Sequence, residues 1–593
     1  MPTLNWIGKD KIVNHHLDVP FHVLEHKYGY TAENGQQEEC TNSGNMIIHG
    51  DNLTALKSLL PQYEGRVDCV YIDPPYNTGE EKWIYNDNVS DPHVNKWLGD
   101  VVGKEGEDLS RHDKWICMMY PRLKLLYKLL SADGLIFISI DDNECYFLKL
   151  ICDSIFGSTN FVTNFIWEKR KNRENRKVVS IRHDYILCYS KNKKINDRYL
   201  NLLPMTGEAL SRYKNPDNDP NGLWKSDPVT AQAGHATKDQ FYTLTAPKGN
   251  EFLPPAGRCW IYTKDVMDCE IKKNHIWFGE DGNNVPRKKT YLYDKDRGLV
   301  PESIWFADAV KTTEFAKNNI KEIFQNESPF ETPKPVDLIQ RILDLATSKN
   351  SIILDSYAGS GVTGHAVIKK NKSDNGNRKF ILIELMDYAE TITAERIKRV
   401  ISGYDYNGKK EEEIYCHKLS PKDLLNGEDL LSEANNVIEE NTDSYDKISK
   451  PKIDDNCLKV IGTKNYKDTM PGLGGSFDYY ELGEPLFKED ENLNEKVGED
   501  KIREYIYYSE TRQSLSRKRD LKHKYLLDTY KSTGYYFYYE PNKLTTLGLD
   551  TLGIVGEIAE QYIIYADVCT LSKEYMTEKH IIFKKIPRDI KRF

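Results

Sequence analysis

One short run of residues combines the groups that would hold an amino group of a nucleobase. In Asp73-Pro74-Pro75-Tyr76, the aspartate supplies a carboxylate, the first proline a backbone carbonyl and the tyrosine an aromatic ring. The two acceptors would each take one N–H of an exocyclic amino group, which leaves the nitrogen lone pair free to attack. The ring would stack on a base that has left its duplex. Four residues also fit a plain tight turn after a core strand, so a second motif has to decide.

The residues before this run must position it. Val70, Tyr71 and Ile72 are β-branched or aromatic, as in a short buried strand. The two prolines that follow stop the strand and stiffen the turn. Ligands bind at the carboxyl ends of strands in open α/β sheets. Asp73 and Tyr76 are therefore predicted to face a ligand site.

The second motif is the stretch 352–364, which runs from an apolar strand through a loop of small residues into a helix. Glycines at 359 and 361 would let the backbone approach a ligand closely. A further strand, 380–383, ends in Glu384, and an acidic residue there suits ribose hydroxyls. Together these features predict a nucleoside site.

The two motifs carry a family resemblance. The run 73–76 resembles motif IV of amino-methylating DNA methyltransferases, mostly those that act on adenine N6, and the glycine loop resembles motif I of S-adenosylmethionine-dependent methyltransferases. Tyr357 stands where that motif usually has Phe. Because the Asp-Pro-Pro-Tyr run precedes the glycine loop, the order resembles the β class, a circular permutation of the usual fold. Over about 45–400 the chain is most similar to the Mod (modification) subunit of type III restriction-modification systems.

This resemblance implies a fold and a set of site residues. The fold would be α/β: a circularly permuted class I (Rossmann-like) methyltransferase with an inserted target-recognition region and a C-terminal α+β domain. Asp73, Pro74, Pro75 and Tyr76 would be catalytic. The residues predicted to bind S-adenosyl-L-methionine are Asp51, Thr332, Lys334, Asp355, Tyr357, Gly359, Gly361, Thr363 and Glu384.

Some of these residues also fit simpler roles. Thr332 and Lys334 lie in a turn that resembles motif X, which encloses the methionine end of the cofactor, and a proline-rich helix start is the alternative. Asp51 follows a strand and precedes a helix, so it also fits a helix N-cap, and the two roles are compatible.

Two basic clusters are predicted to contact DNA. One, at 169–177, lies between strands of the catalytic domain and would follow phosphates, although a charge run is usually only a solvated face. The other, at 287–289, lies in an insertion that resembles the family's target-recognition region and is rich in residues that read base edges. The predicted DNA-binding residues are Lys169, Arg170, Lys171, Arg173, Arg287, Lys288 and Lys289.

Three other features have less specific interpretations. The acidic residues 141–144 are predicted to stabilise the start of the next helix rather than hold a metal. The polar loop 82–111, with Trp83, Tyr85 and Trp97, would close over the flipped base or pack locally. The run 217–222 imitates the start of a calcium loop, but Pro228 stands where a glutamate is required, which excludes an EF-hand.

Composition narrows the class of protein. The net charge of −9 means that DNA contacts must use local basic patches. The eleven cysteines include no Cys-x-x-Cys pair, so no metal site and no disulfide framework is expected. No run suggests a membrane span or a signal peptide. We therefore expect a cytoplasmic, nucleoid-associated bacterial protein.

The expected organisation has six parts along the 593 residues. They are an N-terminal arm (1–44), a catalytic half (45–191), a target-recognition insertion (192–325), a cofactor half (326–415), a linker (416–456) and a C-terminal dimerisation or partner domain (457–593).

The function expected from the sequence is methylation of adenine N6 in a flipped base of duplex DNA, as a modification and recognition subunit. Cytosine N4 methylation is the nearest alternative, although Ser usually replaces Asp73 in such enzymes. A DNA-recognition scaffold for a restriction helicase-nuclease, or an orphan methyltransferase, are further alternatives. The resemblance implies three partners: double-stranded DNA, a second copy of the chain and a restriction (helicase-nuclease) subunit.

Overall fold

The structure, a computed structural model, describes most of the chain. The described residues are 4–78, 111–175, 178–193, 199–293, 298–420, 423, 427–454, 456–488, 490–516, 523–541 and 543–588. The predicted base-closing loop, apart from Arg111, and the end of the first basic cluster lie outside them. The chain forms two compact units, Met1–Tyr199 with Ser303–Phe593, and Leu200–Glu302. The second unit lies within the predicted insertion but is shorter at both ends.

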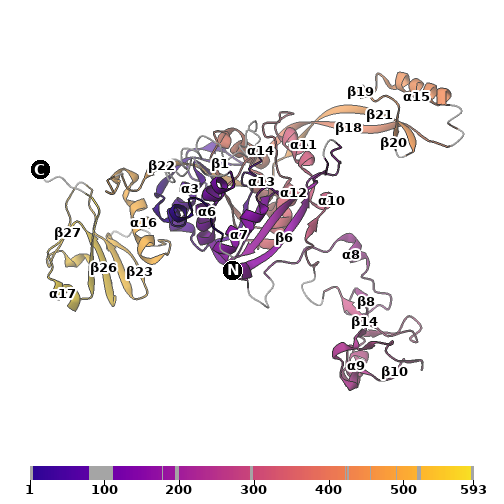
Figure 1. Ribbon diagram of the computed structural model, residues 1–593, viewed down its shortest axis with the longest axis horizontal. Coiled ribbons are helices and arrows are strands. Elements are labelled where there is room, and N and C mark those ends of the chain that lie inside the picture. The colour runs from indigo at the N-terminus through magenta and orange to yellow at the C-terminus, as the bar shows by residue number, and fades with distance from the viewer. Residues whose placement is uncertain are drawn as a thin grey trace. The chain divides into compact units, whose positions relative to one another are not determined.

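An eleven-stranded sheet forms the centre of the first unit (Figure 1). Its strands are β1 (His22–Thr31), β2 (Gly35–Gln37), β3 (Met46–His49), β4 (Val67–Ile72), β5 (Leu130–Ile140), β6 (Phe161–Glu168), β7 (His183–Ser190), β15 (Ile304–Trp305), β16 (Ile352–Asp355), β17 (Lys379–Glu384) and β22 (Ser476–Pro485). Their order across the sheet is β15-β6-β7-β5-β4-β16-β17-β3-β22-β1-β2.

The order of the central strands brings the two motifs together. Strand β16 inserts between β4 and β17 and runs parallel to both, with Leu354 paired to Val70. Both strands are almost wholly apolar and buried, as expected for parallel strands that are covered on both faces. Their carboxyl ends therefore meet at one edge of the sheet. An α/β fold with the glycine-loop strand supplied late in the chain confirms the predicted permuted fold class.

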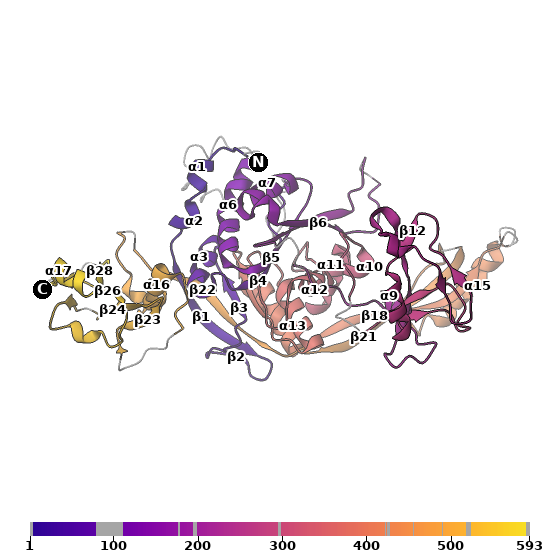
Figure 2. The same ribbon diagram turned by 90° about the horizontal axis from the view of Figure 1, so that it is seen from below.

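Helices cover both faces of this sheet (Figure 2). On one face α3 packs on α6 and α6 on α7, and on the other α12 packs on α13 and α13 on α14. These six helices are α3 (Asn52–Tyr63), α6 (Arg111–Leu129), α7 (Cys145–Phe156), α12 (Val336–Ala346), α13 (Val362–Asp374) and α14 (Glu395–Ser402). Further helices of the unit are α1 (Lys9–Ile12), α2 (His15–Asp18), α10 (Ala307–Val310) and α11 (Thr313–Ile323). Among the described residues, no helix has the length and apolar character that a bilayer crossing requires.

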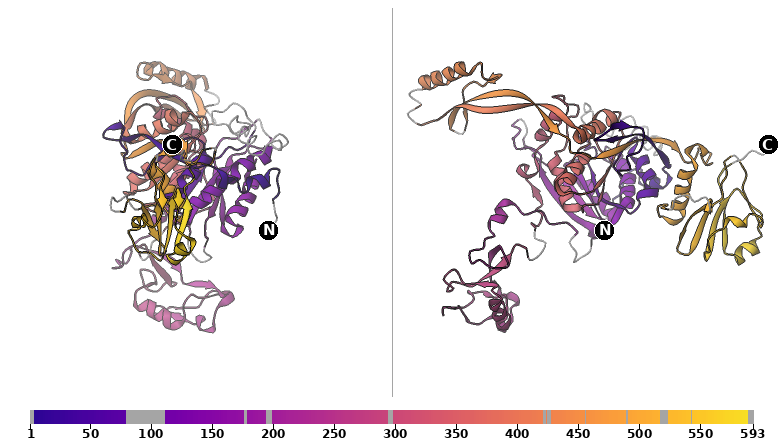
Figure 3. Two further views of the ribbon diagram at one scale, coloured as in Figure 1. Left: turned by 90° about the vertical axis from the view of Figure 1, so that its left-hand side faces the viewer. Right: turned by 180° about the vertical axis from the view of Figure 1, so that it is seen from behind.

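Beyond the main sheet the chain forms a long hairpin. Strands β18 (Gly403–Lys418) and β21 (Cys457–Pro471) pair antiparallel along their length, as Figure 3 shows. The segment predicted as a linker carries regular structure in this hairpin. Its elements are α15 (Gly427–Asn441), β19 (Lys447–Ile448) and β20 (Lys452–Asp454).

The predicted C-terminal domain divides among several sheets, and its first strand, β21, already belongs to the hairpin. Strand β22 pairs with β3 and so belongs to the main sheet. The rest forms a four-stranded sheet whose core includes the buried rings of Tyr536 and Phe537. Its elements are α16 (Glu499–Thr511), β23 (Leu526–Tyr530), β24 (Thr533–Phe537), β26 (Gln561–Ala566), α17 (Lys573–Glu578) and β28 (Ile581–Lys585), with a separate pair β25 (Thr546–Leu547) and β27 (Val568–Cys569).

The second compact unit is built from short strands around a small apolar core that includes Trp260, Met267 and Phe278. Of its three small sheets, one has β14 between β13 and β8, and the other two pair β9 with β12 and β10 with β11. The elements are α8 (Gly207–Ser211), β8 (Trp224–Pro228), β9 (Thr230–Gln232), β10 (Leu244–Thr245), β11 (Glu251–Phe252), β12 (Arg258–Trp260), α9 (Lys264–Lys272), β13 (Ile276–Trp277) and β14 (Arg287–Tyr291).

Candidate active site

A cavity of about 630 Å³ lies where the chain leaves β4 and β16. Asp73 and Tyr76 line it from the end of β4, and Asp355 and Tyr357 line it from the end of β16. The turn before α12, the helix α11 and the connection between β6 and β7 supply other walls. The volume falls in the range of pockets that hold a drug-sized ligand. Residues from the catalytic and cofactor motifs therefore face one space.

Asp73 is held by a lysine from the motif X turn. The Nζ atom of Lys334 donates a hydrogen bond to Asp73 Oδ2 at 2.5 Å and lies 5.1 Å from the centroid of the Tyr76 ring. The other oxygen of Asp73 is buried and makes no hydrogen bond within the described residues. Burial raises the pKa of Tyr76 well above its usual value, helped by the charges of Asp73 and Asp184. The site thus offers a free carboxylate oxygen beside a neutral ring.

Residues of neighbouring elements contact the turn 73–77, which is called the catalytic turn below because of the role predicted for it. Trp115 in α6 donates from Nε1 to the carbonyl of Pro75 at 2.7 Å. Asn77 has a left-handed φ of 58° and donates to Glu144 Oε1 at 2.5 Å. His112 Nδ1 lies 2.8 Å from the same oxygen. These contacts attach the turn to α6 and to the residue before α7.

Glu144 is a residue whose role the sequence interpretation missed. Its side chain is fully buried, and burial raises its pKa. It is the N-cap residue of α7 but makes no side-chain cap hydrogen bond, so stabilisation of the helix start by this carboxylate stays a prediction. The signal available in the sequence was its position at the end of β5, the strand beside β4.

Hydrogen bonds from buried carboxylates hold the glycine loop. Asp355 accepts from Thr363 Oγ1 at 2.5 Å and from the backbone N–H of Tyr357 at 3.0 Å. Glu384 accepts from the N–H of Gly359 at 2.7 Å. Gly361 adopts a φ of 77° at the start of α13. Burial raises the pKa of both Asp355 and Glu384 to about 7.

The predicted cofactor residues divide by position. Thr332, Lys334, Asp355, Tyr357 and Gly359 line the cavity. The remaining four, Asp51, Gly361, Thr363 and Glu384, are outside its lining and support the elements around it. Their direct contact with a cofactor stays a prediction.

Asp51 is the N-cap of α3, as one interpretation expected, since it accepts from Thr54 N at 2.8 Å. It also belongs to a chain of contacts that ends at the glycine loop. Arg122 donates to Asp51 at 3.2 Å and to Asn52 at 2.5 Å, and Asn52 donates to the carbonyl of Ser356 at 3.1 Å. Asn52 and Arg122 are buried polar residues that the sequence interpretation did not identify.

The first basic cluster lies at the cavity, but part of its charge is already paired. Lys169 donates to Asp184 at 2.5 Å, and Asp184 is a buried cavity residue that was not predicted. Burial raises the pKa of Asp184 to about 6. Arg170 pairs with Glu174 at 3.3 Å, whereas exposed Arg173 lines the cavity.

Lys171 pairs with exposed Asp308. Exposed pairs of this kind are weak enough to exchange for phosphate. Arg170, Lys171 and Arg173 thus fit the predicted DNA-facing role better than Lys169, whose partner is buried.

In the second unit, the prediction for Lys289 is wrong. Its ammonium is buried and paired with Asp217 and, at 2.6 Å, with Asp219. It therefore cannot contact DNA without losing a buried ion pair. Two aspartates of the run that imitates a calcium loop thus pair with Lys289. Arg287, bonded to Ser226, and Lys288 lie nearer the surface.

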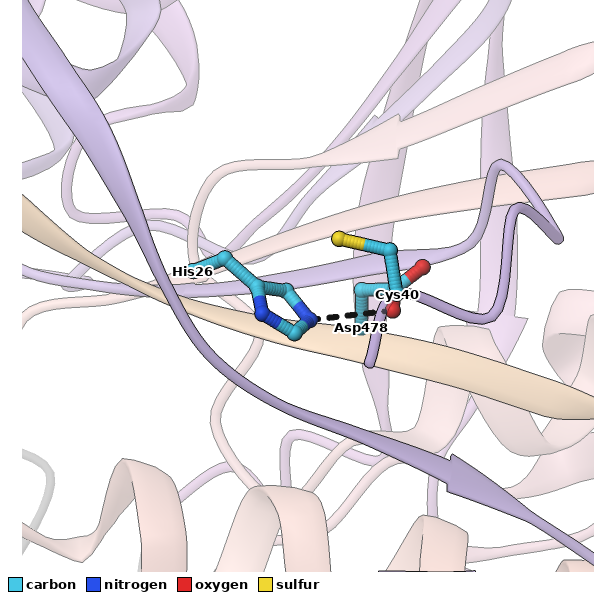
Figure 4. A group of neighbouring side chains, drawn as sticks. All are labelled: His26, Cys40 and Asp478. Carbon is cyan, nitrogen blue, oxygen red and sulfur yellow. Dashed lines mark hydrogen bonds and ion pairs between the residues drawn. The ribbon is translucent and has the colours of Figure 1, made fainter. Parts of the chain in front are cut away.

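One group away from the cavity has the donor types of a metal site. Donor atoms of His26, Cys40 and Asp478 lie within 4.8 Å of one another (Figure 4). The carboxylate of Asp478 is already committed, because it accepts from His26 at 3.2 Å and from both the N–H and the hydroxyl of Thr41. These bonds attach the loop after β2 to β1 and β22, which is a structural role.

Comparison with known proteins gives a consistent result. The family described as DNA methylase matches residues 67–395. The StyLTI Mod subunit of a type III restriction-modification enzyme from Salmonella typhimurium strain LT2 is 37% identical over 363 residues, which cover 59% of this chain and 54% of that protein. The EcoPI Mod subunit from Escherichia phage P1 is 32% identical over 426 residues, covering 64% and 63%.

A relative of another type is also similar. The type II methyltransferase M.KpnI from Klebsiella pneumoniae is 31% identical over 358 residues, covering 57% of this chain and 80% of that protein. The match thus spans less than two thirds of each of the two Mod subunits and most of the type II enzyme.

Proposed function

Because the chain belongs to the DNA methylase family, we propose that it transfers a methyl group from S-adenosyl-L-methionine to N6 of a flipped adenine in duplex DNA. One observation carries this proposal. Asp73 with Tyr76 and the glycine loop, about 280 positions apart in the sequence, line one cavity because β4 and β16 are parallel neighbours.

The residues present fit the proposed cofactor. The cavity combines carboxylates, which suit a positively charged ligand, with aromatic and apolar walls such as Tyr357, Phe330 and Val362. Glycine backbone at the end of β16 permits close approach. When bound, the cofactor supplies an electrophilic methyl group on a cationic sulfur. Asp355, Tyr357, Gly359 and Thr332 are the residues that we assign to hold it, and Lys334 lies beside them in the cavity.

The remaining chemistry belongs to the catalytic turn. Asp73 and the carbonyl of Pro74 would accept the two N–H groups of the adenine amino group, and Tyr76 would stack on the ring. These contacts orient the nitrogen lone pair toward the methyl carbon, and orientation supplies most of the acceleration. The new N–C bond replaces the C–S bond, whose electron pair stays on sulfur. Asp73 then accepts the proton that the methylated nitrogen loses and stabilises the charge that develops there.

Three further parts of the proposal concern the target base, the subunit role and the oligomeric state. Adenine is favoured over cytosine N4 by the aspartate at position 73 and by the similarity to type III Mod subunits. Those relatives also support a role as the modification and recognition subunit of a type III system, with a restriction subunit as partner. Similarity to a type II methyltransferase supports the alternative of an enzyme that works alone. We propose a homodimer, which light scattering of the pure chain would test.

The direct test is to identify the product. The chain would be incubated with labelled S-adenosyl-L-methionine and unmethylated genomic DNA, and the DNA digested to nucleosides. We expect label in N6-methyladenine, whereas label in N4-methylcytosine would replace adenine as the substrate. No transfer to DNA would contradict the proposed function.

A pair of variants tests the catalytic assignment. Asp73→Ala should lower the rate of methylation by about 100-fold or more while cofactor binding persists, because it removes an acceptor made for the reacting nitrogen. Asp142→Ala removes an exposed carboxylate at the end of β5 and serves as the control. Normal methylation by Asp73→Ala would refute the mechanism.

A further inference from the structure

Lys334 is held firmly over the catalytic turn. It stands between Pro333 and Pro335, and the latter is the N-cap residue of α12, so its backbone has little freedom. Its side chain is only 9% exposed. The ammonium reaches Asp73 at 2.5 Å and lies 5.1 Å from the centre of the Tyr76 ring.

These two contacts are the ones that the proposed function gives to the target base. An amino group of adenine would donate an N–H to Asp73, and the base would cover the ring of Tyr76. The ammonium of Lys334 already donates to that carboxylate and lies against that ring. The lysine therefore occupies Oδ2 of Asp73 and lies near the Tyr76 ring, whereas Oδ1 makes no hydrogen bond within the described residues. A base that used Oδ2 would have to displace the ammonium.

Other carboxylates lie within electrostatic reach of Lys334. Burial raises the pKa of Asp184 and of Asp355, and the charge of Lys334 opposes both increases. Both residues line the same cavity. Asp184 is already paired with Lys169, whereas Asp355 accepts only from neutral groups, Thr363 and the N–H of Tyr357. The lysine thus has another acidic neighbour if it leaves Asp73.

From this geometry we infer that Lys334 is a positioning residue that covers Asp73 and Tyr76 until a positive charge enters the cavity beside it. The inference rests on the proposed function and adds a regulatory step to it. Two like charges in a partly desolvated cavity repel strongly. Lys334 would therefore leave Asp73 for a cationic sulfonium ligand and would stay on Asp73 with the neutral product, S-adenosylhomocysteine. The base site would be open with the cationic cofactor and covered after transfer.

The test compares two ligands that differ in charge. Sinefungin carries a positive amine near the position of the sulfonium, and S-adenosylhomocysteine is neutral there. Both share the adenosine and the amino-acid end. Calorimetry would give the affinity of each for the full chain without DNA, for wild type and for Lys334→Met. Lys334→Gln is a second neutral variant, and Lys317→Met removes another lysine that lines the same cavity.

We expect both neutral variants to raise the affinity for sinefungin relative to S-adenosylhomocysteine by about tenfold or more, because a repelling charge is gone and Asp73 is free. Lys317→Met should leave that ratio near the wild-type value. A ratio unchanged in both Lys334 variants would overturn the inference. So would an equal loss of affinity for both ligands, which would make Lys334 an ordinary contact for their shared amino-acid end.

The outcomes separate this inference from the function it extends. Binding of both ligands with an unchanged ratio overturns the role of Lys334 and leaves the methyltransferase proposal intact. Failure of both ligands to bind the wild-type chain would overturn the proposed function and this inference with it. Thermal unfolding of each variant shows whether the chain has remained folded. Affinity that is lost because the chain unfolds is then not mistaken for the loss of a contact.

Discussion

At the scale of single residues, burial separates carboxylates that look alike in the sequence. Asp73 keeps a side chain that is 23% exposed and is paired with a lysine, as a group that meets a substrate requires. Asp355 and Glu384 are 1% and 3% exposed and accept hydrogen bonds from the glycine loop and from the start of α13. Carboxylates at similar positions at strand ends thus differ in their exposure and in the groups that they accept hydrogen bonds from.

The two buried carboxyl groups, Asp355 and Glu384, predict that the stability of the fold depends on pH. The pKa of Asp355 and of Glu384 is about 7 in the folded chain, above the ordinary values of 3.8 and 4.5. The folded chain therefore holds these protons more tightly than the unfolded chain. The stability that they contribute is present at low pH and is lost as the pH rises from about 4 to about 7.

Replacing one of these carboxyl groups tests this dependence. Asp355→Asn cannot ionise, so its free energy of unfolding should fall less steeply with pH than that of the wild type. Denaturant unfolding at several values between about pH 5 and about pH 8 would measure both slopes. Parallel slopes for the two proteins would show that Asp355 ionises normally in the folded chain.

At the scale of elements, the glycine loop depends on one backbone conformation. Gly361 has a φ of 77°, and a Cβ there would lie 2.9 Å from the carbonyl oxygen of Thr393. Backbone atoms cannot move aside as a flexible side chain can. The start of α13 is therefore compatible with glycine and with few other residues.

Gly361→Ala should lower the free energy of unfolding by about 1–3 kcal/mol, through strain at positive φ and the contact with Thr393. Gly427→Ala is a suitable control, because Gly427 begins α15 with open space around it and an ordinary φ. The control should change stability by a few tenths of a kcal/mol. Equal unfolding midpoints for the two variants would contradict the argument.

At the scale of the whole molecule, the two compact units have separate cores. The unit Leu200–Glu302 is organised around its own apolar cluster and around the buried ammonium of Lys289. Removing one partner of a buried ion pair leaves the other charges uncompensated. A change at Lys289 should therefore weaken its own unit selectively.

Lys289→Met should lower the stability of the unit Leu200–Glu302 by about 3–5 kcal/mol. Hydrogen exchange measured on peptides from both units would detect it, with faster exchange confined to this unit. The ammonium of Lys288 lies over the Tyr262 ring. Lys288→Met should therefore lower the stability of the unit by less than about 1 kcal/mol. Faster exchange in both units would mean that they unfold together.

Local patterns in the sequence predicted many elements well. The strand predicted before the glycine loop is β16, and the strand predicted at 380–383 is β17. The turn of Asp73 follows β4 as expected, because β-branched residues and prolines act over a few positions. Family resemblance supplied the permuted order, which the position of β16 confirms.

Only the tertiary structure decided which residues that are distant in the sequence are in contact. Lys334 meets Asp73 across 261 positions, and Glu144 meets Asn77 across 67. Lys289 is paired inside its unit, although its neighbours in the sequence are also basic. Strand β22 joins the main sheet, although it lies within the predicted C-terminal domain. Periodicity and turn residues predict local helices, strands and turns. The charge or strand that each residue contacts depends instead on which strands are neighbours in the folded sheet.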